Sequence, residues 1–470
     1  MEQTEFGITL FTLCAVSGSL LFPGVREWVR SLRKKPFLAV LIILSVLAVC
    51  LGGQRGARAV VEDPVDTIRT FRILVLLFVG VPALIYFALS TKRAGASGSL
   101  TCMALYAILA MFSATYSLFP LLSLYKGFEV AVFVALGLYA GTTLYTWQDV
   151  GDLVNILLLV LWYFIVSALI GGLVAPSVAW YWGAAGGYMS FTLSGVFPDI
   201  NPNTLTQLAG IVAGCSLVWI FQVSKVSQKV GFSIVFFTAL LCIVASHSRT
   251  SILAFLITLV IILTVYKKKG LAVFIMAIGG LLFLFFAIGD IIIDYFMRGQ
   301  TTEQFTSLSG RTTFWPLVME WISKSPLMGH GFYSSQKVLF GVPTVDNTYL
   351  EVLLGLGVIG LTFFCLAVVG VMINLWRAKP LAMSNRQESD HIFIWTQLVV
   401  IFIFLFCRSL TGPSFQIFHI NLSIFVLVTV GAAAARRLAK ENASVQVKSS
   451  KVDPGIVVFQ TGGGAEIKAH

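Results

Sequence analysis

Apolar stretches alternate with short polar segments along almost the whole chain. At about 1.5 Å per residue, most of these stretches are long enough to cross roughly 30 Å of membrane hydrocarbon as a helix. Two of them, 232–246 and 250–265, are separated by only three residues, so that they form either a tight hairpin or one broken helix. The pattern predicts about 13 membrane-spanning helices, with an error of one or two. The predicted spans are residues 7–22, 36–53, 73–90, 100–119, 128–146, 153–174, 203–221, 232–246, 250–265, 271–288, 347–376, 392–409 and 417–435.

The composition agrees with this pattern. Of the 470 residues, 57% are hydrophobic and only 11% are charged, which leaves too little polar surface to cover a soluble globule. The expected fold class is therefore all-α, a polytopic bundle of about 12 to 14 transmembrane helices. The seven cysteines fall within or at the ends of predicted spans without a paired spacing, so they indicate neither disulfides nor a metal site.

Lysine and arginine residues mark one set of connecting loops. They follow the first, third, seventh, ninth, eleventh and last predicted spans, which all end on the same side of the membrane. Because basic loops are retained in the cytoplasm, we expect this side to be cytoplasmic and the N-terminus to lie outside. The net charge of +11 is then explained by insertion and by contact with anionic membrane lipids, and it gives no indication of nucleic acid binding.

The longest outer segment, residues 289–346, is too long for a simple connector and is the expected working surface. A helix within it would carry five apolar side chains on one face. These are Phe314, Leu317, Val318, Trp321 and Ile322. With Pro316 in its first turn and Pro326 after its end, the stretch predicts a short interfacial helix anchored by tryptophans.

Three arginines are predicted at the outer ends of helices. Arg249 lies at the mouth of the 232–265 pair, Arg311 precedes the interfacial helix, and Arg408 ends the twelfth span. A guanidinium at such a place costs a few kcal/mol unless it snorkels to headgroup phosphates, which is the simpler interpretation for Arg249, or is paired. Three converging arginines also suit a diphosphate, because each can bind phosphate oxygens through two N–H groups. The outer loops contain neither an Asp-x-Asp pair nor a Cys/His cluster, so we expect no metal and no cofactor, with arginine neutralising a diphosphate leaving group.

A general base is expected where the eleventh span leaves the outer surface. Asp346 is the best candidate, although a carboxylate at a helix start is also a good N-cap. Glu351, about a turn deeper, is either structural or a second acid. His330, between two glycines, could also be catalytic, but the glycines indicate that the backbone turn matters more than the ring.

Other patterns favour structural roles. Lys126 and Glu129 have the spacing of an ion pair on one helix, with substrate contact as the lesser alternative. The segment 355–360 matches a dinucleotide-binding fingerprint by letter, but it lies inside a membrane helix and is interpreted as a small-residue packing stripe. The segment 201–204 is expected to cap the seventh span from outside, where Asn203 could also contact a sugar.

Between about residues 200 and 360, the chain resembles the bacterial O-antigen ligase and O-antigen polymerase family. No single motif is specific for this family, but the order of the motifs and their positions relative to the predicted spans are specific for it. The motifs are Asn201-Pro-Asn203, Ser246-His-Ser-Arg249, Gly310-Arg311 with Trp315, Pro326-Leu-Met-Gly-His-Gly331, and Asp346-Asn-Thr-Tyr-Leu followed by Gly355-Leu-Gly357.

The resemblance implies a metal-independent, inverting glycosyltransferase on the outer face of the bacterial inner membrane. Its donor would be a glycan on undecaprenyl diphosphate, its acceptor a glycan or a lipid-linked glycan, and a chain-length regulator would be a further partner. By analogy, Arg249 and Arg311 hold the diphosphate and residue 346 deprotonates the acceptor. The further substrate contacts expected are Arg408, His330, Trp315, Asn203 and Asn347.

The resemblance also divides the chain. Residues 1–199 would be N-terminal transmembrane helices, 200–376 the catalytic region with outer loop 289–346, 377–435 C-terminal transmembrane helices, and 436–470 a disordered cytoplasmic tail.

The sequence departs from the family at the position of the base. Ligases that join glycan to lipid A-core typically have a histidine where this chain has Asp346. The departure favours a polymerase of O-antigen or exopolysaccharide repeats over such a ligase. A transporter or flippase of lipid-linked sugars is the main alternative, but it should carry its charged residues at mid-membrane depth. An inert membrane scaffold is a third, which the cost of the buried arginines disfavours.

Overall fold

The computed structural model describes residues 23–50, 67–90, 97–182, 191–196, 199–267, 311–333, 345, 347–379, 386–410, 412, 420–450, 460–461 and 464–465. Within this part of the chain, nine helices are long and apolar enough to cross a membrane. Two shorter apolar helices, Pro36–Ala48 and Arg249–Val265, accompany them. The predicted all-α polytopic class is thereby confirmed, whereas the predicted spans 7–22 and 271–288 lie outside the described residues.

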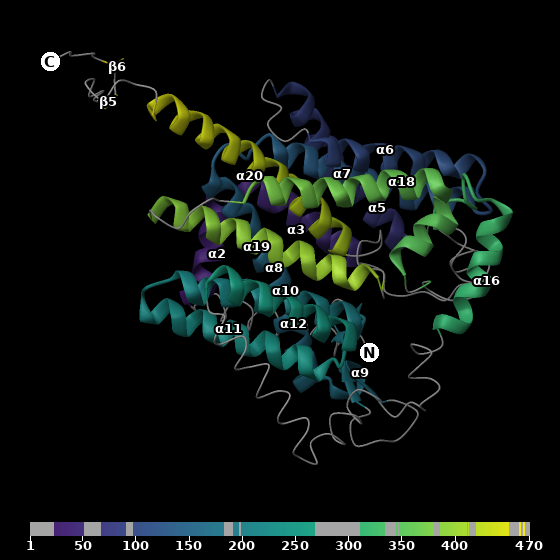
Figure 1. Ribbon diagram of the computed structural model, residues 1–470. Helices are drawn as coiled ribbons and strands as arrows, with labels where there is room; N and C mark the ends of the chain where they lie inside the picture. The colour runs from purple at the N-terminus through teal and green to yellow at the C-terminus, as the bar shows by residue number, and fades with distance from the viewer. Residues whose placement is uncertain are drawn as a thin grey trace.

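The helices form one elongated bundle (Figure 1). They are α2 (Pro23–Lys34), α3 (Pro36–Cys50), α5 (Thr67–Leu89), α6 (Gly98–Phe112), η1 (Ser113–Thr115), α7 (Pro120–Gly141), α8 (Trp147–Val174), α9 (Pro176–Ala179), α10 (Pro202–Gln222), α11 (Val226–Ala245), α12 (Arg249–Val265), α16 (Arg311–Lys324), α18 (Thr348–Arg377), α19 (Arg386–Ser409) and α20 (Ile420–Ser450). Three short antiparallel hairpins join β1 (Trp180–Trp182) to β2 (Phe191–Leu193), β3 (Gly195–Val196) to β4 (Asp199–Ile200), and β5 (Gln460–Thr461) to β6 (Gly464–Ala465).

Several predicted helix ends differ from the structure, and the two largest differences are informative. The fifth span begins at Pro120 and not at residue 128, because Lys126 and Glu129 lie inside the helix, where they neutralise each other. The last helix continues to Ser450, so that the disorder predicted from residue 436 onward is contradicted for 436–450. Apolar runs place only the part of a helix that faces lipid or core, and both helices extend past that part into polar sequence.

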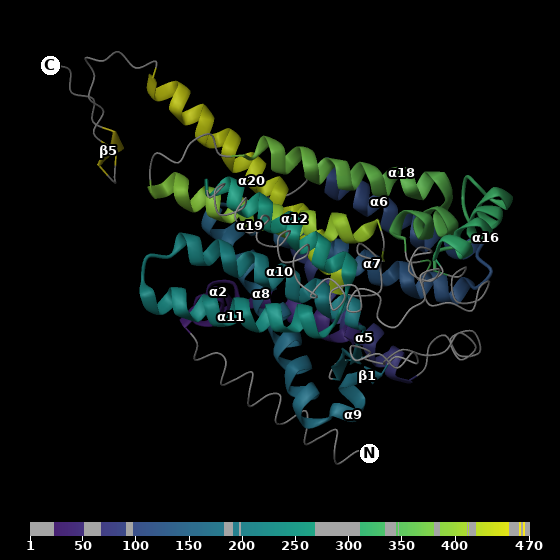
Figure 2. The ribbon, with the colours of Figure 1, turned by 60° about the horizontal axis from the view of Figure 1, so that its bottom comes forward.

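Contacts between helix termini show which loops lie at each of the two ends of the bundle. At one end Ser31 of α2 donates a hydrogen bond to Asp152 of α8 (2.7 Å), and Arg436 of α20 donates one to Asn374 of α18 (3.0 Å). At the other end, Tyr116 after η1 donates to the carbonyl of Met328, next to α16 (2.8 Å). Figure 2 shows α16 and the end of α20 at opposite ends of the bundle. Loops predicted to be cytoplasmic thus gather at one end and loops predicted to be outer gather at the other.

Helix α18 is broken in its outer half. Gly357 has φ +63°, and a side chain there would meet the carbonyl of Leu327 at 2.2 Å. The segment after α16 binds the backbone groups around this break. His330 N–H donates to the Leu354 carbonyl (3.0 Å), and Val358 N–H donates to the Pro326 carbonyl (2.8 Å). Irregular backbone at this depth is tolerated where neighbouring protein satisfies its polar groups.

The predicted small-residue stripe at 355–360 therefore serves the close approach of a loop and not of another helix. Gly329, Gly355 and Gly357 are the residues at the contact, and a Cβ at Gly329 would lie 2.5 Å from the Gly355 carbonyl.

Candidate active site

A three-residue turn at the predicted outer end of the bundle presents Arg249. Ser246 is the C-cap of α11, His247 has φ 51°, and Ser248 precedes α12. This turn divides the 232–265 stretch into two separate helices, α11 and α12. Both helices pack against α10. Ser248 makes no side-chain capping bond to α12, so the first turn of α12 offers backbone N–H groups beside the half-buried Arg249. Such a helix start favours anions.

Arg408 links this turn to the eleventh predicted span. Its side chain is 4% exposed at the end of α19, and its guanidinium donates a hydrogen bond to the hydroxyl of Thr250, the second residue of α12. Gly412 lies against the same guanidinium, because a Cβ there would come within 3.1 Å of it. Thr348, the first residue of α18, donates to the Gly412 carbonyl (2.8 Å). The starts of α12 and α18 and the end of α19 therefore meet around Arg408.

Asn347 caps α18. Its Oδ1 accepts hydrogen bonds from Tyr349 N–H (3.0 Å) and Leu350 N–H (3.1 Å), and its Nδ2 donates to the Leu410 carbonyl (3.1 Å). Asp346 itself lies outside the described residues. The alternative that Asp346 serves as the N-cap of this helix is nevertheless wrong, because Asn347 holds that position.

The peptide preceding Asp346 is held from two sides. Val345 N–H donates to Oε1 of Glu351 (3.0 Å), and the indole N–H of Trp315 donates to the Val345 carbonyl (3.2 Å). Val345 is 1% exposed and Glu351 is 3% exposed. In the sequence, residue 346 therefore lies between Val345, whose backbone groups are hydrogen-bonded on both sides, and Asn347, which caps α18. Glu351 and Trp315 supply the two side-chain hydrogen bonds that hold this peptide.

The helix that was predicted in the outer segment, α16, packs on the start of α18. Val318 and Ile322 of α16 are buried with Val345 and Leu354, and Trp321 packs against this cluster. Leu317, which the helical pattern assigned to the same face, is 44% exposed. Arg311 begins α16, but its side chain lies outside the described part of the chain.

His330 is engaged by its backbone and by its ring. Nε2 lies 2.8 Å from the Trp321 carbonyl, which can only accept, so that this nitrogen carries the proton. The ring stands edge to face against Trp321 at a centroid distance of 5.4 Å. Because the neighbouring glycines have positive φ and the His330 N–H binds α18, the turn is the dominant feature, as the glycines indicated.

Asn203 lies in the first turn of α10, where its N–H donates to Oδ1 of Asn201 (2.8 Å). Asn201 caps this helix as predicted. Helix α10 packs along both α12 and α19. Because α10 and α12 both begin at the predicted outer end, Asn203 and Arg249 share that end of the bundle.

The predicted ion pair of Lys126 with Glu129 belongs to a larger buried ionic cluster that also contains Arg72, a partner that the sequence did not indicate. Glu129 is 0% exposed and binds Lys126 (2.9 Å) and, in addition, Arg72 of α5 (2.7 Å). The Lys126 ammonium lies over the rings of Tyr125 (4.5 Å) and Tyr333 (5.6 Å). Burial, with Glu351 and Glu129 nearby, raises the pKa of Tyr333 well above its usual range, so that it stays a neutral phenol. Arg72 stands at the outer end of an apolar run, which is the same signal that identified Arg249.

This cluster predicts a large effect on stability. Replacing Glu129 by glutamine leaves two buried cations without a counter-charge, and we expect it to lower the free energy of unfolding by about 3–5 kcal/mol. Thermal unfolding of the purified protein in detergent measures the change. Glu320 pairs with Lys324 on the exposed side of α16, so Glu320→Gln is the matched control, with an expected cost of about 0–1 kcal/mol. Equal melting temperatures for the two variants would show that the cluster does not brace the bundle.

Comparison with known families gives one match at the site. Residues 234–365 match the family model described as O-Antigen ligase. The matched segment runs from within α11 to within α18, so that it includes Arg249, Arg311 and the start of α18 but not Arg408. No curated protein matches the chain.

Proposed function

We propose that this multi-pass membrane protein is a glycosyltransferase that uses a polyprenyl-diphosphate-linked glycan, and the match of residues 234–365 to the O-antigen ligase model supports this proposal. The family consists of membrane enzymes that act on lipid-linked glycans. We propose in particular an undecaprenyl-diphosphate donor, transfer without a metal ion, and an active site on the outer face of the bacterial inner membrane.

The observation that carries this proposal is the meeting of the α12, α18 and α19 ends. Arg408 binds Thr250, next to Arg249, and the loop after Arg408 binds Thr348, next to the Asn347 cap. Cationic side chains and a helix start therefore lie near the chain position that precedes α18. An arrangement of this kind suits a diphosphate beside a general base.

We propose the following division of roles. Asp346 accepts the proton of the acceptor hydroxyl, whose oxygen forms a bond to the anomeric carbon of the donor sugar. The bond from that carbon to the diphosphate breaks, and undecaprenyl diphosphate leaves. A single displacement inverts the anomeric centre. Arg249 and Arg311 stabilise the negative charge that grows on the diphosphate as the bond breaks.

Arg408 acts differently in this scheme. It is buried and already binds Thr250, so that it orients the start of α12 and contributes positive charge at short range. Trp315, His330, Asn203 and Asn347 complete the proposed contact set.

A polymerase of O-antigen or exopolysaccharide repeats is our preferred activity. Asp346, in the position where ligases to lipid A-core typically have histidine, supports this choice. The ligase reaction remains the second candidate, since both reactions use the same donor chemistry.

A strain lacking the protein tests this function directly. We expect single, unpolymerised repeat units to accumulate on the lipid carrier at the outer leaflet, which extraction and mass spectrometry of the lipid-linked glycans can measure. Complete repeat polymer that is not joined to lipid A-core would instead identify a ligase. Polymer of normal length, with donor accumulating only on the cytoplasmic side, would favour a flippase and contradict the proposal.

A further inference from the structure

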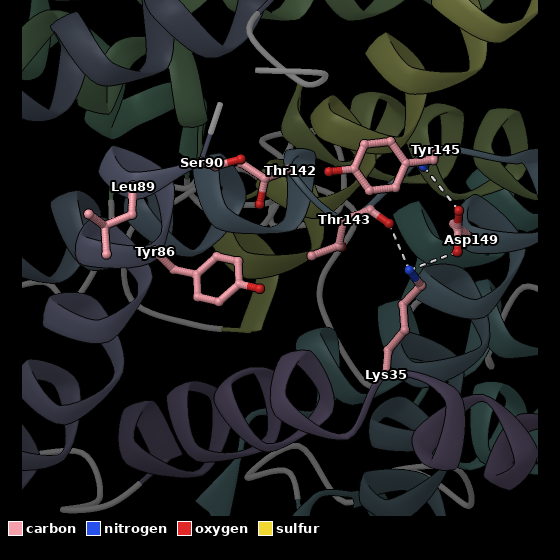
Figure 3. A pocket seen from close by; sticks show the side chains of 8 residues that line it. All are labelled: Lys35, Tyr86, Leu89, Ser90, Thr142, Thr143, Tyr145 and Asp149. Atoms are coloured by element: carbon pink, nitrogen blue, oxygen red, sulfur yellow. Dashed lines mark hydrogen bonds and ion pairs between the residues drawn. The ribbon is translucent and has the colours of Figure 1, made fainter. Parts of the chain in front are cut away.

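A polar pocket lies at the opposite end of the bundle from the candidate active site. Its volume is about 470 Å³, and it opens where the ends of α5 and α7 and the starts of α3 and α8 meet (Figure 3). By the distribution of basic loops, this end is the predicted cytoplasmic one. The proposed transfer reaction makes no use of it.

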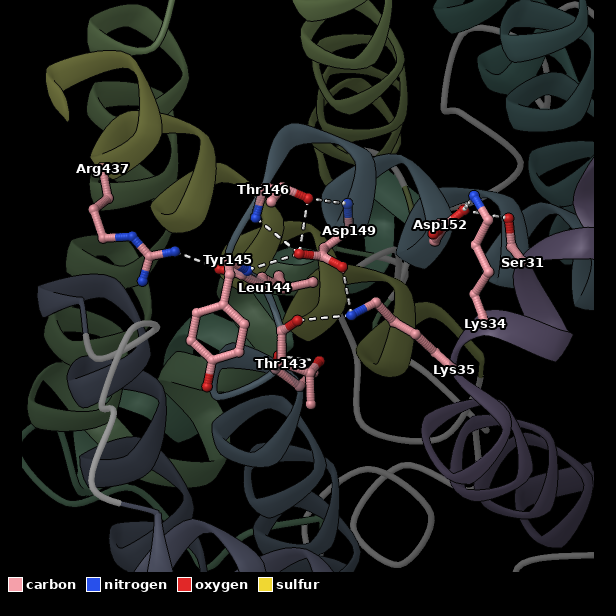
Figure 4. A network of polar contacts seen from close by, with 11 residues as sticks. Ser31, Lys34, Lys35, Thr143, Leu144, Tyr145, Thr146, Asp149, Asp152 and Arg437 are labelled. Carbon is pink, nitrogen blue, oxygen red and sulfur yellow. Dashed lines mark hydrogen bonds and ion pairs between the residues drawn. The ribbon is translucent and has the colours of Figure 1, made fainter. Parts of the chain in front are cut away.

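Lys35 and Asp149 form the polar floor of the pocket. The Lys35 ammonium binds Asp149 Oδ1 (2.8 Å) and donates to the Thr143 carbonyl (2.7 Å), which occupies two of its three N–H groups. The other carboxylate oxygen, Oδ2 of Asp149, accepts hydrogen bonds from Tyr145 N–H and from the N–H and hydroxyl of Thr146. Figure 4 shows this network and its continuation to Arg437, whose guanidinium donates to the Leu144 carbonyl. The floor can therefore donate to a ligand from Lys35, whereas Asp149 has little capacity left to bind an ammonium group.

The walls add hydroxyl groups. The hydroxyls of Thr142 and Thr143 donate to the carbonyls of Tyr139 and Ala140 within their own helix end, so their oxygens can still accept a hydrogen bond from a ligand. Tyr86 lines the pocket with its phenol. The lining thus offers a cation for a phosphate and oxygen acceptors for ligand hydroxyls.

The mouth of the pocket continues onto a surface suited to lipid. Leu89 is 77% exposed and Tyr86 is 54% exposed. One face of α5 beyond them is also apolar and open, with Val81, Leu84 and Ile85 all exposed. Tyrosines are typical of the membrane–water boundary, and an acyl chain could follow this face of α5 while the headgroup enters the pocket.

We propose that the pocket binds the headgroup of an anionic glycerophospholipid, with the phosphate at Lys35 and the headgroup hydroxyls at Thr142 and Thr143. Basic pockets between helices on the cytoplasmic side bind such headgroups. A lipid with an amine headgroup fits less well, because Asp149 is already saturated and Asp152 is engaged by Ser31 and Lys34.

The test compares neighbouring lysines. Full-length protein is delipidated in detergent, phosphatidylglycerol or phosphatidylethanolamine is added, and native mass spectrometry measures the bound lipid. Lys35→Gln should lower phosphatidylglycerol occupancy about fivefold, the effect of one basic residue near anionic lipid. Lys34→Gln is the matched control, because Lys34 also pairs with an aspartate of α8 but is 51% exposed and lies outside the pocket.

A second variant keeps the proposal testable if Lys35→Gln disturbs folding. Ser90→Trp fills the pocket without changing charge, and we expect it to reduce phosphatidylglycerol binding to the same extent. Equal losses for Lys34→Gln and Lys35→Gln would indicate general surface attraction and overturn the proposal. Equal binding of the two lipids by the unmodified protein, or unchanged binding by Ser90→Trp, would overturn it as well.

Discussion

Asp346→Asn is expected to lower turnover by about 10²–10⁴, the range for loss of a general base, with expression and folding unchanged. Amide and carboxylate have nearly the same shape, so this variant removes the base and little else. The cap of α18 is provided by Asn347, and the substitution should therefore not weaken the helix start. The measurement is the rate of glycan transfer from a purified polyprenyl-diphosphate donor in reconstituted membranes.

Glu320→Gln is the matched control for this experiment, because it makes the same chemical change on an exposed part of α16. A fully active Asp346→Asn protein would move the base to His330 or Glu351. The structure then separates these two. Glu351 already accepts from Val345 N–H. Glu351→Leu, which removes the acceptor, would therefore act by displacing the Val345 peptide, and a smaller loss with an altered KM would accompany that role.

Replacing Arg249 should cost about 10²–10³ in turnover, the scale for losing one preorganised donor to a developing charge. Lysine should rescue poorly, because an ammonium cannot reproduce the two parallel N–H groups of a guanidinium. The same result is expected for Arg311. Rates at saturating donor distinguish loss of transition-state stabilisation, which lowers kcat, from loss of ground-state binding, which raises KM.

Arg377→Lys is a suitable control, since Arg377 is an exposed arginine at the far end of α18. The simpler interpretation of Arg249 is snorkelling to lipid phosphates. Under that interpretation lysine would substitute fully, and a normal rate for Arg249→Lys would remove Arg249 from the proposed diphosphate site.

The fold class and the order of helices were determined by the sequence. Apolar runs that must satisfy their backbone in lipid can only be helices, and the basic loops determine which ends share a side. The caps at Asn201 and the ion pair of Lys126 with Glu129 were also readable, because they depend on residues three or fewer positions apart. The arginines at the predicted outer helix ends were also identified from the sequence, because a charged side chain beside an apolar run has a free-energy cost that does not depend on which helices pack against that run.

Contacts between distant segments were decided only by the tertiary structure. No local pattern shows that Arg72 shares Glu129 with Lys126 or that Arg408 binds Thr250, because these partners are brought together by packing of separate helices. The break at Gly357 was likewise hidden within an apolar run, since it depends on backbone groups of the segment 326–331. Sequence alone determined which residues carry charge at the outer ends, and tertiary packing decided which of them meet, because helix ends far apart in the chain become neighbours only when the bundle closes.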